Sequence, residues 1–147
     1  MLAIACGGGS SSTGPGGGSA DLSASINGSS WLGTDGAKAT RTVAGGDTII
    51  SFGGANSNAS IILGLAFTDS GPRTYLIGGF DEPSNALIEE GAKGWAANVA
   101  GGTGSITIDT ISATRLTGTF MFNAVPVSGS GVSGDEAVTN GKFALSF

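Results

Sequence analysis

The chain has 147 residues, a length that suits one domain with a hydrophobic core. Its formal net charge is −5, and its six basic residues are spread along the sequence. This distribution argues against a nucleic-acid-binding surface, which needs clustered Lys and Arg, and against electrostatic docking on anionic lipid. No apolar run approaches the length that a helix needs to span a bilayer.

The chain begins M-L-A-I-A-C-G, which is similar to the end of a bacterial lipoprotein signal peptide. An apolar stretch and a small residue precede Cys6, the only cysteine, which in such proteins receives lipid and becomes the mature N-terminus. Ala3 stands where Leu is usual, and the basic region and most of the apolar region are missing. We therefore predict that residues 1–6 are a truncated signal with the lipobox Cys6. The alternative is a free cysteine in a soluble protein.

Residues 7–19 are Gly and Ser with one Thr and one Pro. Such a segment has no apolar side chains to bury, so it predicts a disordered, flexible tether with an end-to-end distance of about 20 Å. A lipidated cysteine followed by this tether would hold a domain just off a membrane surface.

The all-β domain, residues 20–147, opens with apolar side chains at alternate positions: Leu22, Ala24 and Ile26. N-G at 27–28 is a strong turn signal, and D-G at 35–36 and G-G-D at 45–47 predict further turns between short apolar runs. Residues 60–67 are apolar at nearly every position, which predicts a central strand covered on both faces.

Residues 82–91 leave three alternatives open. Pro83 in a first turn and Gly91 at the end would suit a short helix, the only one that the sequence suggests. The others are an irregular loop and a strand through residues 86–88.

The clearest period lies in residues 104–147. Alternate positions of one stretch are apolar, with Met121 on the other parity: Leu116, Phe120, Phe122 and Ala124. Phe143, Leu145 and Phe147 repeat the pattern. Because alternate side chains of a strand point to opposite faces, these are half-buried antiparallel strands. With the turns at regular spacing, the sequence predicts a single all-β antiparallel sandwich or flattened barrel of about eight to ten strands.

Five short motifs occur in the order of a known family: A-S-I-N-G-S-S-W at 24–31, G-P-R-T-Y-L-I at 71–77, G-S-I-T-I at 104–108, G-T-F-M-F-N-A at 118–124 and V-T-N-G-K-F at 138–143. This order resembles uncharacterised lipoproteins with an all-β domain that are typical of Bacteroidota. The resemblance covers nearly the whole domain. It implies no activity, so it assigns no functional residue.

Missing residue types exclude several chemistries. The sequence has no His, which excludes a Ser-His-Asp triad and His-ligated metals, and one Cys excludes internal disulfides and Cys-rich zinc sites. G-S-G-V-S-G at 129–134 matches a dinucleotide-binding pattern but lies between two predicted strands, without the helix that the pattern requires. We predict no cofactor.

Carboxylates are the remaining acid–base candidates, as the adjacent pairs Asp81-Glu82, Glu89-Glu90 and Asp135-Glu136. Neighbours on a strand point to opposite faces, so adjacency does not make a catalytic pair, and we expect solvated loop charges. We predict no structural metal. A loosely bound Ca²⁺, which takes carboxylate and carbonyl oxygens from flexible loops, would use Asp135 and Glu136 or Asp81 and Glu82.

Three aromatic residues could stack on a sugar: Trp31, Tyr75 and Trp95. Core packing is the alternative, because aromatic side chains dominate buried area. An exposed row of rings would favour sugar binding, and two carboxylates facing each other in a cleft would favour hydrolysis.

These observations predict a non-enzymatic, structural or binding protein, anchored through lipidated Cys6 to the bacterial cell envelope, at the outer membrane or cell surface. Its partners would be the membrane and either glycans or another envelope protein. The alternatives are a carbohydrate-binding module and a small carboxylate-dependent glycan hydrolase.

Overall fold

The computed structural model describes residues 21–67, 71–79 and 83–147. Cys6, the predicted tether at 7–19, Asp81 and Glu82 lie outside these ranges. Within the described residues the secondary structure consists of eleven strands, slightly more than expected. They are β1 (Asp21–Ile26), β2 (Ser29–Leu32), β3 (Asp35–Ala44), β4 (Asp47–Ala55), β5 (Ser60–Phe67), β6 (Arg73–Ile77), β7 (Ser84–Glu90), β8 (Lys93–Ala97), β9 (Thr103–Ile111), β10 (Arg115–Pro126) and β11 (Glu136–Ser146). No helix in these residues could cross a membrane.

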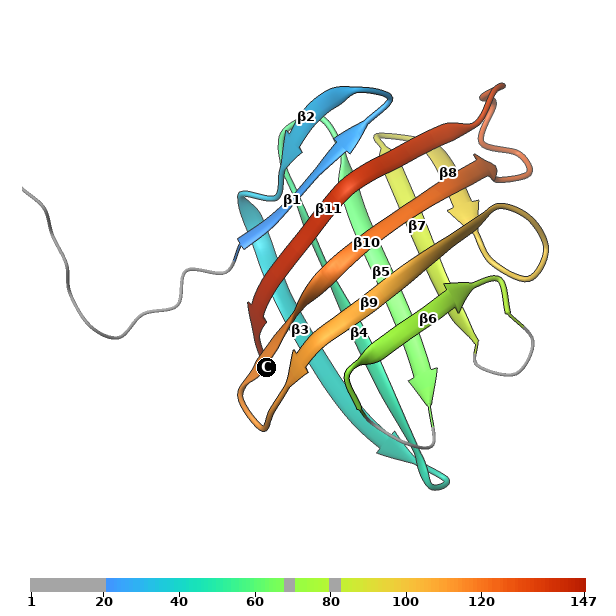
Figure 1. The fold of residues 1–147 in the computed structure, drawn as a ribbon. Helices are drawn as coiled ribbons and strands as arrows, with labels where there is room; N and C mark the ends of the chain where they lie inside the picture. Colours follow the sequence, from blue (N-terminus) through green and yellow to red (C-terminus); the bar gives the residue numbers. More distant parts are fainter. Residues whose placement is uncertain (1–20, 68–70, 80–82) are drawn as a thin grey trace, which may run out of the picture.

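The strands form one antiparallel sheet that curls into two facing layers (Figure 1). Its main path is β2-β1-β11-β10-β8-β7-β5-β4-β3, and β9 and β6 extend it from β10. β10 belongs to both layers, because most of it pairs with β11 and β9 while Val125 and Pro126 pair with β8. The predicted antiparallel all-β fold is therefore confirmed, as a half-barrel in which a strand passes from one layer to the other.

The hydrophobic core fills the space between the layers. Phe120 and Phe122 are buried, and Met121 between them is 54% exposed, which confirms the predicted inside and outside of β10. Phe52 of β4 packs across the core on Phe143 of β11, with ring centroids 4.5 Å apart. Side chains from both layers thus interdigitate, as they do in a sandwich.

One side of the curled sheet is closed by Arg41 of β3. Its Nη2 donates to the Ser112 carbonyl oxygen at 2.8 Å, and its guanidinium carbon lies 4.2 Å from the centroid of the Phe147 ring. These contacts link the edge strand β3 to the turn after β9 and to the last residue of the chain.

A bulge in β11 allows both halves of this strand to face the core. Phe120 pairs with Gly141 but Phe122 pairs with Val138, so β11 holds one extra residue, and Asn140 adopts a φ of 54°. The extra residue shifts the alternation of inward and outward side chains. Val138 and Phe143 are therefore both buried although they have opposite parity.

The structure decides among the three alternatives for 82–91 and overturns one prediction. Residues 83–91 do not form a helix, because β7 pairs with β5 and β8 and buries Ser84, Ala86 and Ile88 with a period of two. The alternative of a strand through 86–88 is confirmed. β5 is covered on one face only, since Ile62 is 40% exposed. The layer that contains β5 packs on a single neighbouring layer, so its outer face meets solvent.

Candidate functional site

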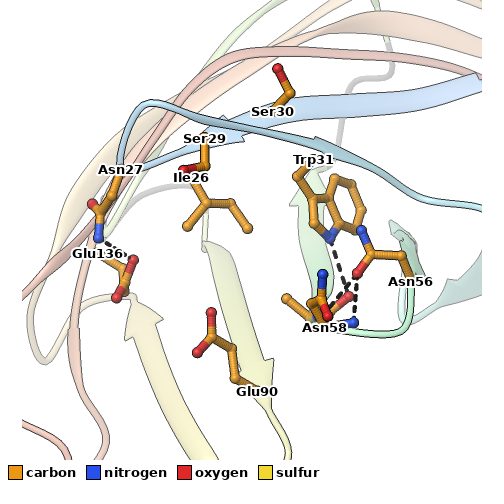
Figure 2. A pocket seen from close by; sticks show the side chains of 10 residues that line it. Ile26, Asn27, Ser29, Ser30, Trp31, Asn56, Asn58, Glu90 and Glu136 are labelled. Carbon is orange, nitrogen blue, oxygen red and sulfur yellow. Dashed lines mark hydrogen bonds between the residues drawn. The ribbon is translucent and has the colours of Figure 1, made fainter.

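A pocket of about 280 Å³ lies at one end of the curled sheet. The β1–β2 turn, the β4–β5 loop, the end of β7 and the start of β11 meet there (Figure 2). Most of its lining is polar: Asn27, Ser29, Ser30, Asn56, Asn58, Glu90 and Glu136, with Ile26, Trp31 and Ala59 as apolar wall. Its volume is at the lower end of the range for small-ligand sites, so it suits a small molecule or the end of a larger one.

The upper wall is built by the N-G turn that the sequence predicts. Asn27 and Gly28 have φ values of 47° and 83°, the left-handed pair that a two-residue hairpin turn requires. The backbone N–H of Asn27 donates to the Ala137 carbonyl at 2.8 Å, and its Oδ1 accepts from the Ala137 N–H at 2.9 Å. Its Nδ2 donates to Glu136 Oε2 at 2.6 Å (Figure 2). Asn27 therefore fixes both the turn and the Glu136 carboxylate.

The floor is formed by Trp31 and the β4–β5 loop. Trp31 is 5% exposed, and its Nε1 donates to the Ala59 carbonyl at 3.2 Å. Asn56 Oδ1 accepts from the backbone N–H groups of Asn58 and Ala59, at 2.9 and 3.0 Å, and its Nδ2 donates to the Leu32 carbonyl at 3.1 Å. These bonds hold the loop against β2, so the floor is rigid.

Two carboxylates from distant parts of the sequence enter this pocket. Glu90 ends β7 and Glu136 begins β11, and Figure 2 shows both side chains directed into the same space. The pKa of Glu136 is raised above its ordinary value, first by burial and then by the negative charge of Glu90, while Lys93 opposes the shift. In the described part of the chain, no hydrogen bond reaches the Glu90 carboxylate.

The fold places the members of two adjacent carboxylate pairs, at 89–90 and 135–136, in different surroundings. Glu89 points away from the pocket, with the Ser60 hydroxyl at 3.4 Å from its Oε2, and Asp135 accepts from Asn123 Nδ2 at 3.1 Å. The two carboxylates that line the same pocket, Glu90 and Glu136, come from different pairs in the sequence. Their signal in the sequence was only that both residues lie next to turns, and the strand order was needed to bring those turns together.

The predicted calcium residues are occupied by other contacts where the structure describes them. Asp135 is bonded to Asn123 and Glu136 to Asn27. Asp81 and Glu82 lie outside the described ranges. In the residues that are described, His, Cys, Asp and Glu do not gather in any group of three that could hold a metal ion.

The three aromatic residues named as stacking candidates are buried. Tyr75 is 1% exposed and packs on Phe67 with ring centroids 5.3 Å apart. Trp95 is 4% exposed and donates from Nε1 to the Gly134 carbonyl at 3.0 Å, which secures the glycine-rich loop before β11. These residues therefore form no exposed row of rings. Only Trp31 borders the pocket, beneath its polar rim.

Fold and site together define a small antiparallel β domain with a polar pocket at the end where the β1–β2 turn lies. The family model described as a domain of unknown function (DUF6252) matches residues 19–144, so the chain belongs to this family. Comparison with curated proteins and with solved structures gave no match. Membership of a family without an assigned activity agrees with the resemblance noted from the sequence, whereas the lipoprotein character and the bacterial group stay predictions.

Proposed function

We propose that this chain is a non-catalytic binding protein of the cell envelope, whose end pocket captures a small hydroxyl-rich molecule such as the end of a glycan. The observation that carries the proposal is the convergence of amide, hydroxyl and carboxylate groups from four parts of the chain on one pocket. Small-ligand sites characteristically combine a concave, preformed wall with a few such groups.

The rigidity of the walls favours binding over a purely structural role. Asn27 and Asn56 each use their side-chain amide on the surrounding chain, which holds the turn and the loop in place without a ligand. A preformed site loses little conformational entropy when a ligand enters. Among the described residues, the side chains of Ser29 and Asn58 on the rim make no hydrogen bond to the rest of the protein.

A glycan array probed with the full 147-residue chain tests this function. We expect a restricted set of glycans to bind, and Asn58→Ala to weaken their binding because the Asn58 side chain lines the pocket. Asn85→Ala is the matched control, since Asn85 is exposed on β7 outside the pocket. An array without any bound glycan, or equal binding by both variants, would contradict the proposal.

The envelope location rests on the sequence A-I-A-C before a Gly/Ser stretch. In a precursor with a complete signal, expressed in a bacterium, Cys6→Ser should move the protein from the membrane fraction to the soluble fraction. Membrane association as strong as that of the parent would rule out anchoring by lipid at Cys6.

A glycan hydrolase is the second candidate, and Glu90 with Glu136 is the observation that favours it. Two carboxylates in one pocket, one with a raised pKa, could divide the roles of acid and base. Glycans bound on the array would then be cleaved, and new reducing ends would appear at a rate that Glu136→Gln abolishes. If the bound glycans stay intact, the hydrolase candidate is contradicted and only the binding role remains.

A further inference from the structure

Three hydrogen-bond donors in the walls of the pocket are engaged by the protein itself. Trp31 Nε1 donates to Ala59, Asn56 Nδ2 to Leu32 and Asn27 Nδ2 to Glu136. Trp31 Nε1 is buried and has a single proton, so a ligand that accepts from it would have to break the bond to Ala59 at a substantial cost, whereas each Asn amide keeps a second N–H.

Acceptors, by contrast, are available. The Glu90 carboxylate receives no hydrogen bond within the described residues, and Glu136 receives one on Oε2, which leaves further acceptor capacity on this group. The Ser29 hydroxyl and the Asn58 amide on the rim can act in either sense, whereas Figure 2 shows the Ser30 hydroxyl directed away from the pocket. The free capacity of the pocket is therefore weighted towards acceptors, which suits a ligand rich in donors.

The charge of the pocket points the same way. Glu90 and Glu136 line it, and no Lys or Arg does. Lys93, across the β7–β8 hairpin from Glu90, is the basic residue that acts on Glu136, and its influence is smaller than the repulsion from Glu90. Two carboxylates with so little compensation favour a positively charged group, and hydrogen bonds between ions of opposite charge are the stronger kind.

A metal ion fits this arrangement less well than an organic cation. Ca²⁺ takes six to eight oxygen ligands, and the described residues hold no group of three acidic, His or Cys side chains. An ammonium group needs only three acceptors, because it carries three N–H donors. Two carboxylates and a rim hydroxyl could meet that number.

We propose that the pocket selects a ligand with a primary ammonium group, such as a sugar whose amine is free. This inference rests on the binding function proposed above and narrows its ligand class. The ammonium lies between Glu90 and Glu136, and the hydroxyls of the sugar ring face Ser29 and Asn58. A neutral sugar of the same shape binds more weakly because it leaves both carboxylates uncompensated.

Isothermal titration calorimetry of the full chain near neutral pH separates the possibilities with four probes: glucosamine, glucose, N-acetylglucosamine and ethanolamine. We expect glucosamine to bind at least about tenfold more tightly than glucose or N-acetylglucosamine, since each charge-assisted hydrogen bond contributes roughly that factor. Equal affinity for the three sugars would overturn the ammonium inference but keep the binding function. No binding of any probe would overturn both. If ethanolamine binds as tightly as glucosamine, the result would support recognition of the ammonium group and contradict recognition of the sugar ring.

Matched variants assign the effect to the two carboxylates. Glu90→Gln preserves shape and should lower the affinity for glucosamine at least about tenfold with little change for glucose. Asp47→Asn removes the same charge at the start of β4, next to the β3–β4 turn at the other end of the molecule (Figure 1), and should change neither. Lys93→Met should strengthen the binding of glucosamine by removing a competing cation. Unchanged affinity in both Glu90→Gln and Lys93→Met would refute the placement of the ammonium.

Discussion

The two ends of β11 lie in opposite environments and are stabilised in different ways. From Val138 to Leu145 the inward side chains are buried among the rings of the core, whereas Glu136 at the start of the strand lines the polar pocket. The core end depends on shape and apolar area, and the pocket end depends on a few directed hydrogen bonds around Asn27. We therefore expect mutations at the core end to change the free energy of unfolding, and mutations at the pocket end to change mainly ligand recognition.

The largest effect is expected where the core end is truncated. Phe122→Ala removes a side chain that is 4% exposed and should lower the free energy of unfolding by about 3–5 kcal/mol. Thr119→Ala, on the exposed face of the same strand, should cost well under half as much. Chemical denaturation of both variants measures the difference. Equal losses would mean that both faces of β10 are buried.

A somewhat smaller loss in the free energy of unfolding is expected when a side chain is added to the packed interior near Phe143. A Cβ on Gly118 would lie 2.5 Å from the Phe143 ring and closer still to the Thr107 carbonyl oxygen. Gly118→Ala should therefore cost about 1–3 kcal/mol. Gly71→Ala, where the added carbon meets nothing within 4 Å, is the control, and thermal melts that rank it as the more damaging change would refute this packing.

At the pocket end, the turn can be separated from the hydrogen bonds that follow it. Asn27→Ala loses the side-chain bonds to the Ala137 N–H and to Glu136 and places Ala at a φ of 47°, for a cost of about 1–2 kcal/mol. Asn27→Gly loses the same bonds but tolerates the turn, so its cost should be lower. The difference between the denaturation midpoints of the two variants gives the contribution of the backbone conformation. A lower midpoint for Asn27→Gly than for Asn27→Ala would contradict this contribution.

The smallest effect concerns the charge on Glu136. Its pKa is raised in the folded protein, so the folded state binds the proton more readily, and ionisation costs stability as pH rises through and above the ordinary glutamate value. Glu136→Gln should raise the melting temperature slightly at neutral pH, and this gain should vanish as the pH falls below that value. A gain that grows on acidification would reverse the sign of the shift.

Much of the core end could be predicted from the sequence. The alternation around Phe120 and Phe122 predicted the buried face, and at the pocket end N-G at 27–28 predicted the hairpin, because both signals are local. The bulge at Asn140 could not be predicted, because an extra residue in a strand is recognised only when the partner strand is known. The exposed outer face of β5 escaped prediction for a related reason: an apolar strand does not reveal how many layers cover it.

Little of the pocket could be predicted. Glu90 and Glu136 belong to adjacent carboxylate pairs in the sequence, but their meeting depends on the strand order β11-β10-β8-β7. Trp31 was a candidate for a ligand contact, yet its role as a floor, hydrogen-bonded to Ala59, comes from a contact between β2 and the β4–β5 loop. Distant contacts of this kind leave no period in a single sequence.

The proposed function requires that the pocket beside the β1–β2 turn binds a ligand. An NMR titration of the full chain with glucosamine tests it most directly, by following backbone amide shifts. We predict that the largest shifts gather at Asn27, Ser29, Ser30, Asn58, Glu90 and Glu136, while amides on the outer face of β10, such as Thr119, stay unchanged. Shifts spread evenly over the sheet, or gathered away from these residues, would contradict the account.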